Sequence, residues 1–379
     1  MKKICVVTST RADYGIISNL IKRIDSDPEL ELQLLVTGSH LSKKFGYTCK
    51  EITSPIAGKV DIEIEQNPHI AMSIAIKKFY EVFNELKPDI VVLFADRYET
   101  LAVAIAAMLA NFPIMHIGGG EASEGVIDEY IRHSITKMSH LHCVICEEYR
   151  NRVIQLGEDP KFVFNVGSLA VENIEKTQLL SKGDLEKKLN FIFGEKNLLV
   201  TFQPETLETG CELGRFKELI DALSELKDTK IIFTMPNSDD GNDTIFGSIN
   251  DYVSTHSNAV VFTSLGMLLY FSTVQFVDGV VGNSSSGITE APSFKIGTIN
   301  IGDRQRGRIQ SKSIINCDCS KESVLNALDK LYSAEFQAML KNVENVYKSN
   351  NTANRIAEIL KTFDGKKILM KRFYKLKTV

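Results

Sequence analysis

Short apolar segments alternate with helical segments along most of this chain, and they do so in two separate series. Near-continuous apolar strands separated by helices indicate a parallel sheet that is covered on both faces. The first series has its strands at about 2–8, 30–38, 89–96, 112–119 and 140–146, and the second at about 197–203, 230–236, 259–264, 274–283 and 296–302. We therefore predict an α/β protein built from two doubly wound, Rossmann-like domains.

The length supports this division, because 379 residues at roughly 150 residues per domain suggest two domains. We place the N-terminal domain at 1–170 and the C-terminal domain at 171–350. The charged stretch at about 167–195 fits a connection between them. The segment from about residue 351 is expected to be helical and ends strongly basic, which is typical of a solvated or domain-docking helix more often than of a membrane-surface helix.

Composition excludes several classes of protein. Lys and Arg number 44 and Asp and Glu number 48, so the net charge of -4 disfavours a nucleic-acid partner. No apolar run approaches the roughly 20 residues that span a bilayer, and the N-terminus leads directly into a strand, so we expect a cytoplasmic protein without a membrane partner. The seven cysteines are scattered, which favours free thiols over disulfides.

The run that contains His140, His142, Cys143 and Cys146 has the residue types of a zinc site. However, the run is predicted to be a buried strand, whose successive side chains point to opposite faces of the sheet. A tetrahedral site would also need further ligands nearby in the sequence. We therefore predict no metal at this run.

Polar and charged residues follow the strands of the first series, where ligands bind to an open parallel sheet. Arg11 follows the first strand, Asp96 and Arg97 follow the strand at 89–96, and Glu121 follows the glycines 118–120. Those glycines allow a tight turn and close backbone approach, although a purely structural turn is the plain alternative. We expect these side chains to gather at one edge of the sheet.

The next predicted helix, at about 127–138, begins with Asp128. Arg132 lies four residues later on the same helical face, a spacing that is usually explained by an ion pair that supports the helix. Asp128 nevertheless adds a third carboxylate to Asp96 and Glu121. This is more acidic chemistry than a stable fold requires, and it favours a catalytic site.

The second domain carries a loop of small residues at 282–287, which leads into a helix containing Glu290. Free backbone N–H groups at a helix N-terminus bind anions, and a diphosphate is the natural occupant. Arg304 follows a later strand and is suited to pair with phosphate or with an acidic loop. The chain lacks the P-loop pattern, the dinucleotide-binding glycine pattern and the G-x-S-x-G elbow, which disfavours NTPases, Rossmann dehydrogenases and serine hydrolases.

Five motifs, in order and spacing, resemble those of hydrolysing UDP-N-acetylglucosamine 2-epimerases of bacterial sialic-acid and legionaminic-acid synthesis. They are TSTRADYG, FADRYE, GGGE followed by IDEYIRHSITKMSHLH, GNSSSGITEAPS and INIGDRQRGR, and the resemblance runs from Lys2 to about residue 313. It implies the glycosyltransferase-B architecture, with the nucleotide held mainly by the C-terminal domain. It also implies a last helix, about 351–379, that returns to the first domain, and a homodimer or homotetramer.

The family's reaction removes the C2 proton of the sugar, expels UDP to leave a 2-acetamidoglucal, and adds water to give N-acetylmannosamine, with no metal or redox cofactor. The resemblance implies that Asp96, Glu121 and Asp128 are the acidic catalytic residues. The predicted substrate and nucleotide contacts are Arg11, Arg97, Gln203, Asn283, Ser284, Ser285, Gly287, Glu290 and Arg304.

One position departs from the family pattern, because relatives usually have a His-Pro pair where this chain has Gln203 and Pro204. Glutamine forms hydrogen bonds but carries neither a proton nor a charge. Gln203 therefore keeps open the alternative of a catalytically weak sugar-nucleotide binding protein. A non-hydrolysing 2-epimerase stays open as well, because the same superfamily contains such enzymes. The choice among UDP-N-acetylglucosamine, its 4-acetamido-6-deoxy relative and a GDP-linked sugar is open as well.

Overall fold

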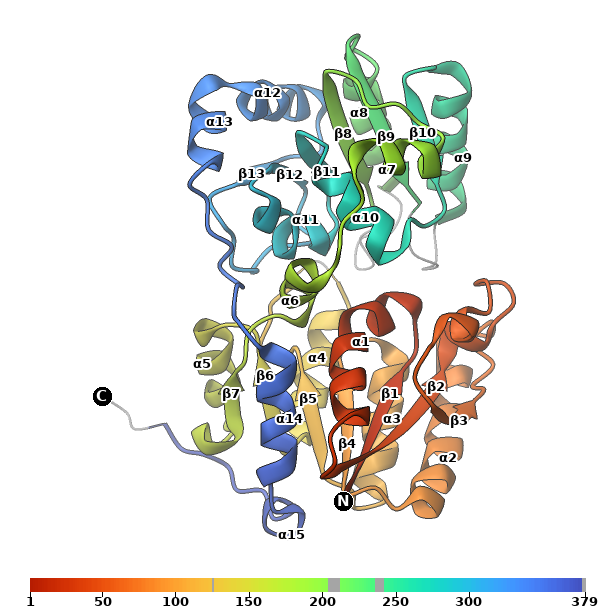
Figure 1. Ribbon diagram of the computed structural model, residues 1–379, viewed down its shortest axis with the longest axis vertical. Coiled ribbons are helices and arrows are strands. Elements are labelled where there is room, and N and C mark those ends of the chain that lie inside the picture. The colour runs from red at the N-terminus through yellow and green to blue at the C-terminus, as the bar shows by residue number, and fades with distance from the viewer. Residues whose placement is uncertain (125, 204–211, 236–241, 377–379) are drawn as a thin grey trace. The chain divides into compact units, whose positions relative to one another are not determined.

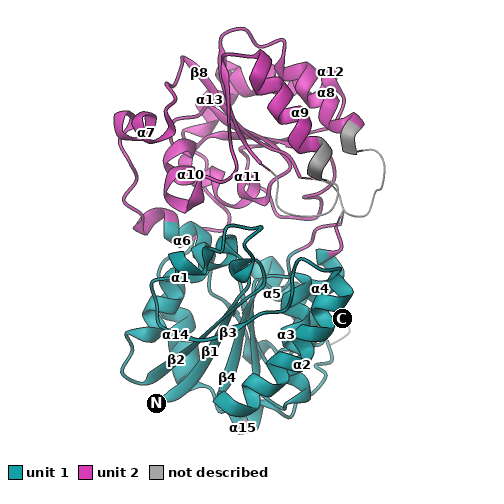
Figure 2. Cartoon of the chain, turned by 90° about the vertical axis from the view of Figure 1, so that its right-hand side faces the viewer, with its two compact units in different colours: residues 1–121, 128–173, 349–379 teal, residues 122–127, 174–348 magenta. Residues whose placement is uncertain are grey.

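The computed structural model describes residues 1–124, 126–203, 212–235 and 242–376 (Figure 1). The chain forms two compact units, which Figure 2 shows in teal and magenta. Unit 1 comprises Met1–Glu121, Asp128–Asn173 and Ser349–Val379, and unit 2 comprises Ala122–Ile127 and Ile174–Lys348. Unit 1 is therefore assembled from three separate stretches of sequence.

Among the described residues, unit 1 has one seven-stranded parallel sheet in the order β3-β2-β1-β4-β5-β6-β7. Its strands are β1 (Lys2–Thr8), β2 (Leu30–Thr37), β3 (Ile56–Val60), β4 (Ile90–Phe94), β5 (Ile114–Ile117), β6 (Leu141–Val144) and β7 (Val163–Asn165). The order reverses between β1 and β4, so the carboxyl ends of these two strands form the switch point where such sheets bind ligands.

Helices cover both faces of this sheet. They are α1 (Arg11–Asp25), α2 (Pro68–Leu86), α3 (Tyr98–Leu109), α4 (Asp128–Met138), α5 (Glu147–Gln155), α14 (Thr352–Thr362) and α15 (Gly365–Ile368), with short 3-10 turns η1 (Gly38–Leu41), η2 (Thr48–Glu51) and η3 (Pro160–Phe162). α1 and α14 share one hydrophobic cluster with one face of the sheet, and α2 and α3 share another with the opposite face. The covered, parallel sheet confirms the predicted fold class for this half.

Unit 2 repeats this architecture with a six-stranded parallel sheet, counted over its described residues, in the order β10-β9-β8-β11-β12-β13. Its strands are β8 (Lys196–Thr201), β9 (Thr229–Thr234), β10 (Ala259–Phe262), β11 (Gly279–Gly282), β12 (Gly297–Ile301) and β13 (Ile314–Cys317). Its helices are α7 (Lys182–Leu189), α8 (Glu212–Leu223), α9 (Asn242–Thr255), α10 (Gly266–Val274), α11 (Ser285–Thr289), η4 (Ala291–Phe294), α12 (Lys321–Tyr332) and α13 (Ala334–Leu340), while α6 (Leu169–Lys176) leads in from unit 1. The second switch point lies between β8 and β11.

The C-terminal helix α14 packs against α1 within unit 1 (Figure 1). Its apolar residues Ile356, Ala357 and Leu360 are fully buried in the same cluster as Leu20 and Ile24 of α1. This burial gives α14 a structural role at the sheet. No helix in the described ranges is long and apolar enough to cross a membrane.

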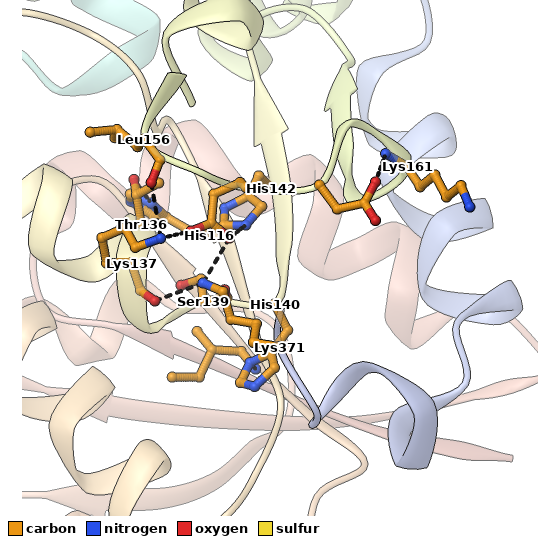
Figure 3. Close-up of polar contacts among 12 residues, drawn as sticks. His116, Thr136, Lys137, Ser139, His140, His142, Leu156, Lys161 and Lys371 are labelled. Atoms are coloured by element: carbon orange, nitrogen blue, oxygen red, sulfur yellow. Dashed lines mark hydrogen bonds and ion pairs between the residues drawn. The ribbon is translucent and has the colours of Figure 1, made fainter. Parts of the chain in front are cut away.

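The segment that follows α14 binds the rest of unit 1 through Lys371, which pairs with the buried carboxylate of Glu158. This carboxylate accepts hydrogen bonds from Lys137 Nζ at 2.6 Å and His142 Nε2 at 3.0 Å, and it pairs with Lys371 Nζ at 2.7 Å. Lys371 also donates to the carbonyls of Lys137 and Ser139 (Figure 3). Burial alone would raise the pKa of Glu158, but these partners outweigh it and lower the pKa to about 2.

We expect Lys371→Met to lower the free energy of unfolding by about 1–3 kcal/mol, the usual cost of removing a hydrogen-bond partner from a charged group. Because the folded pKa of Glu158 lies below its ordinary value of 4.5, its contribution is present above about pH 4.5 and is lost as the pH falls toward 2. Urea unfolding of Lys371→Met and of the exposed control Lys375→Met at pH 7 measures the effect. Equal stability of the two variants would contradict it.

Candidate functional site

The carboxyl ends of β4 and β5 carry the first group of predicted site residues. Asp96 follows β4 after Ala95, which has a left-handed φ of 62°. Glu121 follows β5 after a glycine turn in which Gly118 and Gly120 have φ values of 93° and 81°. A Cβ on Gly120 would lie 2.4 Å from the Tyr149 carbonyl oxygen, so only glycine fits there.

Arg132 of α4 joins these two strand ends. Its guanidinium Nε and Nη2 lie 2.7 and 2.5 Å from Asp96 Oδ2, and Nη1 donates to the Glu121 backbone carbonyl at 3.1 Å and to Glu129 Oε2 at 2.8 Å. The Arg132 side chain is only 1% exposed. Burial alone would lower the pKa of Arg132, but Asp96, Glu121 and Glu129 outweigh it and raise the pKa above its usual value. Arg132 is therefore a permanent buried cation.

The sequence placed Arg132 on the same helical face as Asp128 and suggested a local ion pair. In the structure, Arg132 reaches Asp96 across 36 positions of sequence. Asp128 is the first residue of α4 and is half-buried, and its neighbour Glu129 also binds His133 Nε2 at 2.9 Å. Sequence reasoning therefore missed Arg132 and Glu129 as site residues, since Arg132, which Glu129 binds, has its main partner Asp96 on another element.

Sequence reasoning also missed a second pair of acidic residues, Asp13 and Glu99, which lie close to Arg97. Arg97 caps α3 and its Nε donates to Glu99 Oε1 at 2.8 Å, while Glu99 is fully buried. Glu99 and Asp13 line a cavity of about 10 Å³, which is room for a single water molecule. Burial raises the pKa of Asp13 to about 6, although Arg97 opposes the shift. The sequence did contain a signal for this pair, since Asp13 lies in the motif TSTRADYG and Glu99 in the motif FADRYE.

Arg11, the remaining predicted residue of unit 1, pairs with Glu51 at 3.2 Å. Both side chains are substantially exposed, at 41% and 53%. An exposed pair of this kind contributes little stability and is easily exchanged for another partner. A phosphate contact by Arg11 stays a prediction.

In unit 2, Asn283 connects three strand ends. Its side chain accepts from the Gln203 backbone N–H at 2.6 Å and donates to the Gln203 carbonyl at 2.8 Å. The backbone carbonyl of Asn283 accepts hydrogen bonds from Arg304 Nη1 at 3.1 Å and from Gln305 Nε2 at 2.8 Å. Asn283 is fully buried, so its side chain holds β8 and β11 in place. Residues 204–211, which follow Gln203, lie outside the described residues.

The serine loop begins α11. Ser284 is the N-cap and its hydroxyl accepts from the Ser286 backbone N–H, while Ser285 is the first helical residue and is half-buried. Gly287 allows α11 to approach β12, because a Cβ there would lie 2.7 Å from the Thr298 methyl group. Gly287 thus has a packing role, and a direct ligand contact by its backbone stays a prediction.

Glu290 ends α11 and is 8% exposed. Burial raises the pKa of Glu290, although the hydrogen bond from the Thr289 hydroxyl opposes the shift. A carboxylate held in this way can accept hydrogen bonds from two adjacent hydroxyl groups. Nothing in the described stretches brings three or more His, Cys, Asp or Glu side chains together in a way that could hold a metal ion.

Comparisons with known proteins fit these motifs. The profile of the UDP-N-acetylglucosamine 2-epimerase family matches residues 22–361. A GDP/UDP-N,N'-diacetylbacillosamine 2-epimerase (hydrolyzing) of Campylobacter jejuni is 42% identical over 343 residues, which cover 89% of this chain and 89% of that protein. A polysialic acid biosynthesis protein of Escherichia coli is 38% identical over 371 residues, covering 96% and 94%.

Among solved structures, the UDP-GlcNAc 2-epimerase of Neisseria meningitidis bound to UDP-GlcNAc has a TM-score of 0.80 at 16% identity, covering 94% of this chain and 99% of that one. This likeness confirms the predicted glycosyltransferase-B fold. The family profile spans most of the chain, and the relatives cover nearly all of it at more than 30% identity. The protein is therefore a member of the UDP-N-acetylglucosamine 2-epimerase family.

Proposed function

We propose that this protein is a hydrolysing 2-epimerase that converts UDP-N-acetylglucosamine to UDP and N-acetylmannosamine. The observation that carries the proposal is the buried Arg132, which binds the Asp96 carboxylate and the Glu121 backbone beside the switch point of unit 1. Similarity to a relative whose name specifies a hydrolysing 2-epimerase supports the hydrolysing reaction over the non-hydrolysing alternative.

The proposed reaction begins with removal of the C2 proton by a carboxylate. The electrons of the C2–H bond form a C1–C2 double bond, and the C1–oxygen bond breaks with its electron pair leaving on UDP. Water then bonds to C1 and a proton is delivered to C2 on the opposite face, which yields the free epimeric sugar. A positioned acid or base contributes about 10²- to 10⁴-fold to such proton transfers.

Asp96, Glu121 and Asp128 form the proposed proton-transfer group. Arg132 supports this role, because a fixed buried cation keeps the Asp96 carboxylate oriented for proton transfer. Arg97 and Arg11 are proposed to contact the substrate from the same unit. In unit 2 we assign the diphosphate to the loop at Ser284 and Ser285 together with Arg304, and the ribose to Glu290.

The sugar specificity is a separate part of the proposal. The Campylobacter relative is named for N,N'-diacetylbacillosamine, and the Escherichia coli relative for polysialic acid biosynthesis. We propose N-acetylglucosamine as the sugar and a nonulosonic acid, of the sialic or legionaminic type, as the end product of the pathway. The 4-acetamido-6-deoxy sugar and the GDP-linked sugars are the alternatives to be tested beside it.

Proton and phosphorus NMR of one incubation per nucleotide sugar tests the reaction and the specificity together. UDP with free N-acetylmannosamine is the expected product from UDP-N-acetylglucosamine. Formation of UDP-N-acetylmannosamine would identify a non-hydrolysing enzyme, and unchanged substrate with measurable UDP binding would identify a binding protein. Faster turnover of the diacetylated sugar would reassign the substrate.

Association with a second copy is also part of the proposal. Tyr80 of α2 and Met108 and Leu109 of the neighbouring α3 are exposed at 44%, 44% and 55%. Large apolar side chains exposed on adjacent helices are typical of an interface. We propose a homodimer or homotetramer, and light scattering on the purified protein measures which of the two forms.

We expect Ser285→Asp to weaken UDP binding by at least about tenfold, because a carboxylate would face the diphosphate with like charge at the start of α11. Calorimetric titration with UDP measures the change. Ser320→Asp is a matched control, because it places the same charge at the exposed N-cap of α12 in the same unit. Equal UDP affinity of both variants would move the diphosphate away from this loop.

A further inference from the structure

His116 lies on β5 in the middle of the unit 1 sheet and is fully buried. Its Nε2 is 3.1 Å from the Ala95 carbonyl oxygen, and its Nδ1 is 3.1 Å from the Thr136 hydroxyl of α4 (Figure 3). A carbonyl oxygen only accepts, so Nε2 carries the proton and Nδ1 accepts from Thr136. Burial lowers the pKa of His116 to about 4, so the ring is neutral at pH 7 with both nitrogens satisfied.

The partner of this ring, Ala95, has an unusual backbone. Its φ of 62° is left-handed, a conformation that is unfavourable for a residue with a Cβ. Its N–H donates to the Ile117 carbonyl at 3.1 Å, and its C=O accepts from His116. Both polar groups of the Ala95 backbone are therefore bound to β5, and these bonds determine the direction in which the chain leaves β4 toward Asp96.

The same ring also supports the turn that leads to Glu121. A Cβ on Gly119 would lie 3.0 Å from the Thr136 hydroxyl oxygen and 3.1 Å from His116 Nδ1, so the turn passes directly over this pair. His116 thus contacts the backbone that precedes Asp96 and the turn that precedes Glu121. An apolar residue at this position would fill space but would leave the Ala95 carbonyl without its donor.

We propose that His116 is a positioning residue, which holds Ala95 in the left-handed conformation and thereby directs the Asp96 carboxylate toward Arg132. This inference rests on the proposed function, in which Asp96 takes part in proton transfer. Among the described residues, the ring of His116 bonds to the Ala95 carbonyl and the Thr136 hydroxyl and not to the Asp96 carboxylate, so its hydrogen bonds act on Asp96 through the main chain. The assignment gives a chemical reason for a polar residue inside an otherwise apolar strand.

The test compares His116→Phe with His116→Gln, which keeps an N–H donor at a similar reach. We expect His116→Phe to lower kcat by about tenfold to a hundredfold, since small displacements of a catalytic group are this costly. UDP affinity should stay unchanged, and His116→Gln should recover most of the loss. Thr136→Val, which removes the hydroxyl that fixes the ring tautomer, should lower kcat by a smaller factor.

A second exchange tests the backbone mechanism. Ala95→Gly removes the cost of a positive φ, so in the His116→Phe background it should restore kcat at least threefold. His142→Phe is the matched control: His142 is a buried histidine on the next strand that binds Glu158. It should reduce thermal stability but leave the kcat of the folded enzyme unchanged.

The outcomes separate this inference from the proposed function. If Asp96→Asn is inactive while folded His116→Phe retains kcat within twofold, His116 does not position Asp96. The same conclusion follows if Ala95→Gly gives no recovery and His116→Gln is as impaired as His116→Phe. If Asp96→Asn itself turns over normally, the proposed catalytic group is wrong, and the inference falls with it.

Discussion

Replacing Asp96 with Asn is expected to lower kcat by about two to four orders of magnitude, because the amide keeps the shape of the side chain but cannot accept a proton. Glu121→Gln is expected to have an effect of the same order. UDP affinity should survive both changes, since the proposed diphosphate contacts lie in unit 2. Steady-state release of UDP from UDP-N-acetylglucosamine, combined with calorimetric titration of UDP, measures both quantities.

Asp89→Asn provides the matched control for this experiment. Asp89 precedes the same strand, β4, at its opposite end, where its carboxylate accepts from the Lys3 backbone N–H at 2.8 Å. The same chemical change there should leave kcat near that of the parent. Near-normal turnover of both Asp96→Asn and Glu121→Gln would remove the two carboxylates from the mechanism.

Arg132→Met is expected to lower the free energy of unfolding by about 3–5 kcal/mol, because it leaves the carboxylates of Asp96 and Glu129 without their buried cation. It should also reduce kcat as strongly as Asp96→Asn does. Arg132→Lys should recover only part of either loss, since one ammonium group cannot bind Asp96 and Glu129 and also reach the Glu121 carbonyl in the same geometry.

Urea unfolding and kcat, measured on the same preparations, test this prediction. Arg372→Met on the exposed C-terminal segment removes an arginine of the same size from the surface and should change neither value. The double variant Asp96→Asn with Arg132→Met should be less destabilised than the sum of the single changes, because the two residues share one interaction. Additive losses would show that the Asp96–Arg132 pair does not carry the effect.

The sequence was sufficient for the regular part of the fold. Near-continuous apolar strands and amphipathic helices have a clear period, and the central strands of both sheets and several of the helices between them follow from it. The strands that were missed, β3, β7 and β13, lie at sheet edges and are short. β3 alternates between half-buried and exposed positions until its last residue, Val60, which is buried, so no strong apolar run marks it.

The candidate site was only partly accessible from the sequence. Asp96 and Glu121 could be named because they follow strands, and strand ends meet at one edge of a parallel sheet. Arg132 could not be assigned its role, because its nearest carboxylates in sequence are on its own helix. His116 looked like part of an apolar strand, and only the position of the Ala95 carbonyl shows what the ring does.

The division of the chain into units has a consequence for how the protein is made. Unit 2 is formed almost entirely by the continuous stretch Ile174–Lys348, whereas unit 1 needs α14, which begins at Thr352. During synthesis from the N-terminus, the apolar face of α1 that α14 covers therefore stays exposed until all of unit 2 has left the ribosome. Unit 2 can finish folding first, while the earlier-made half depends on a contact between segments more than 300 positions apart, which is slow to form.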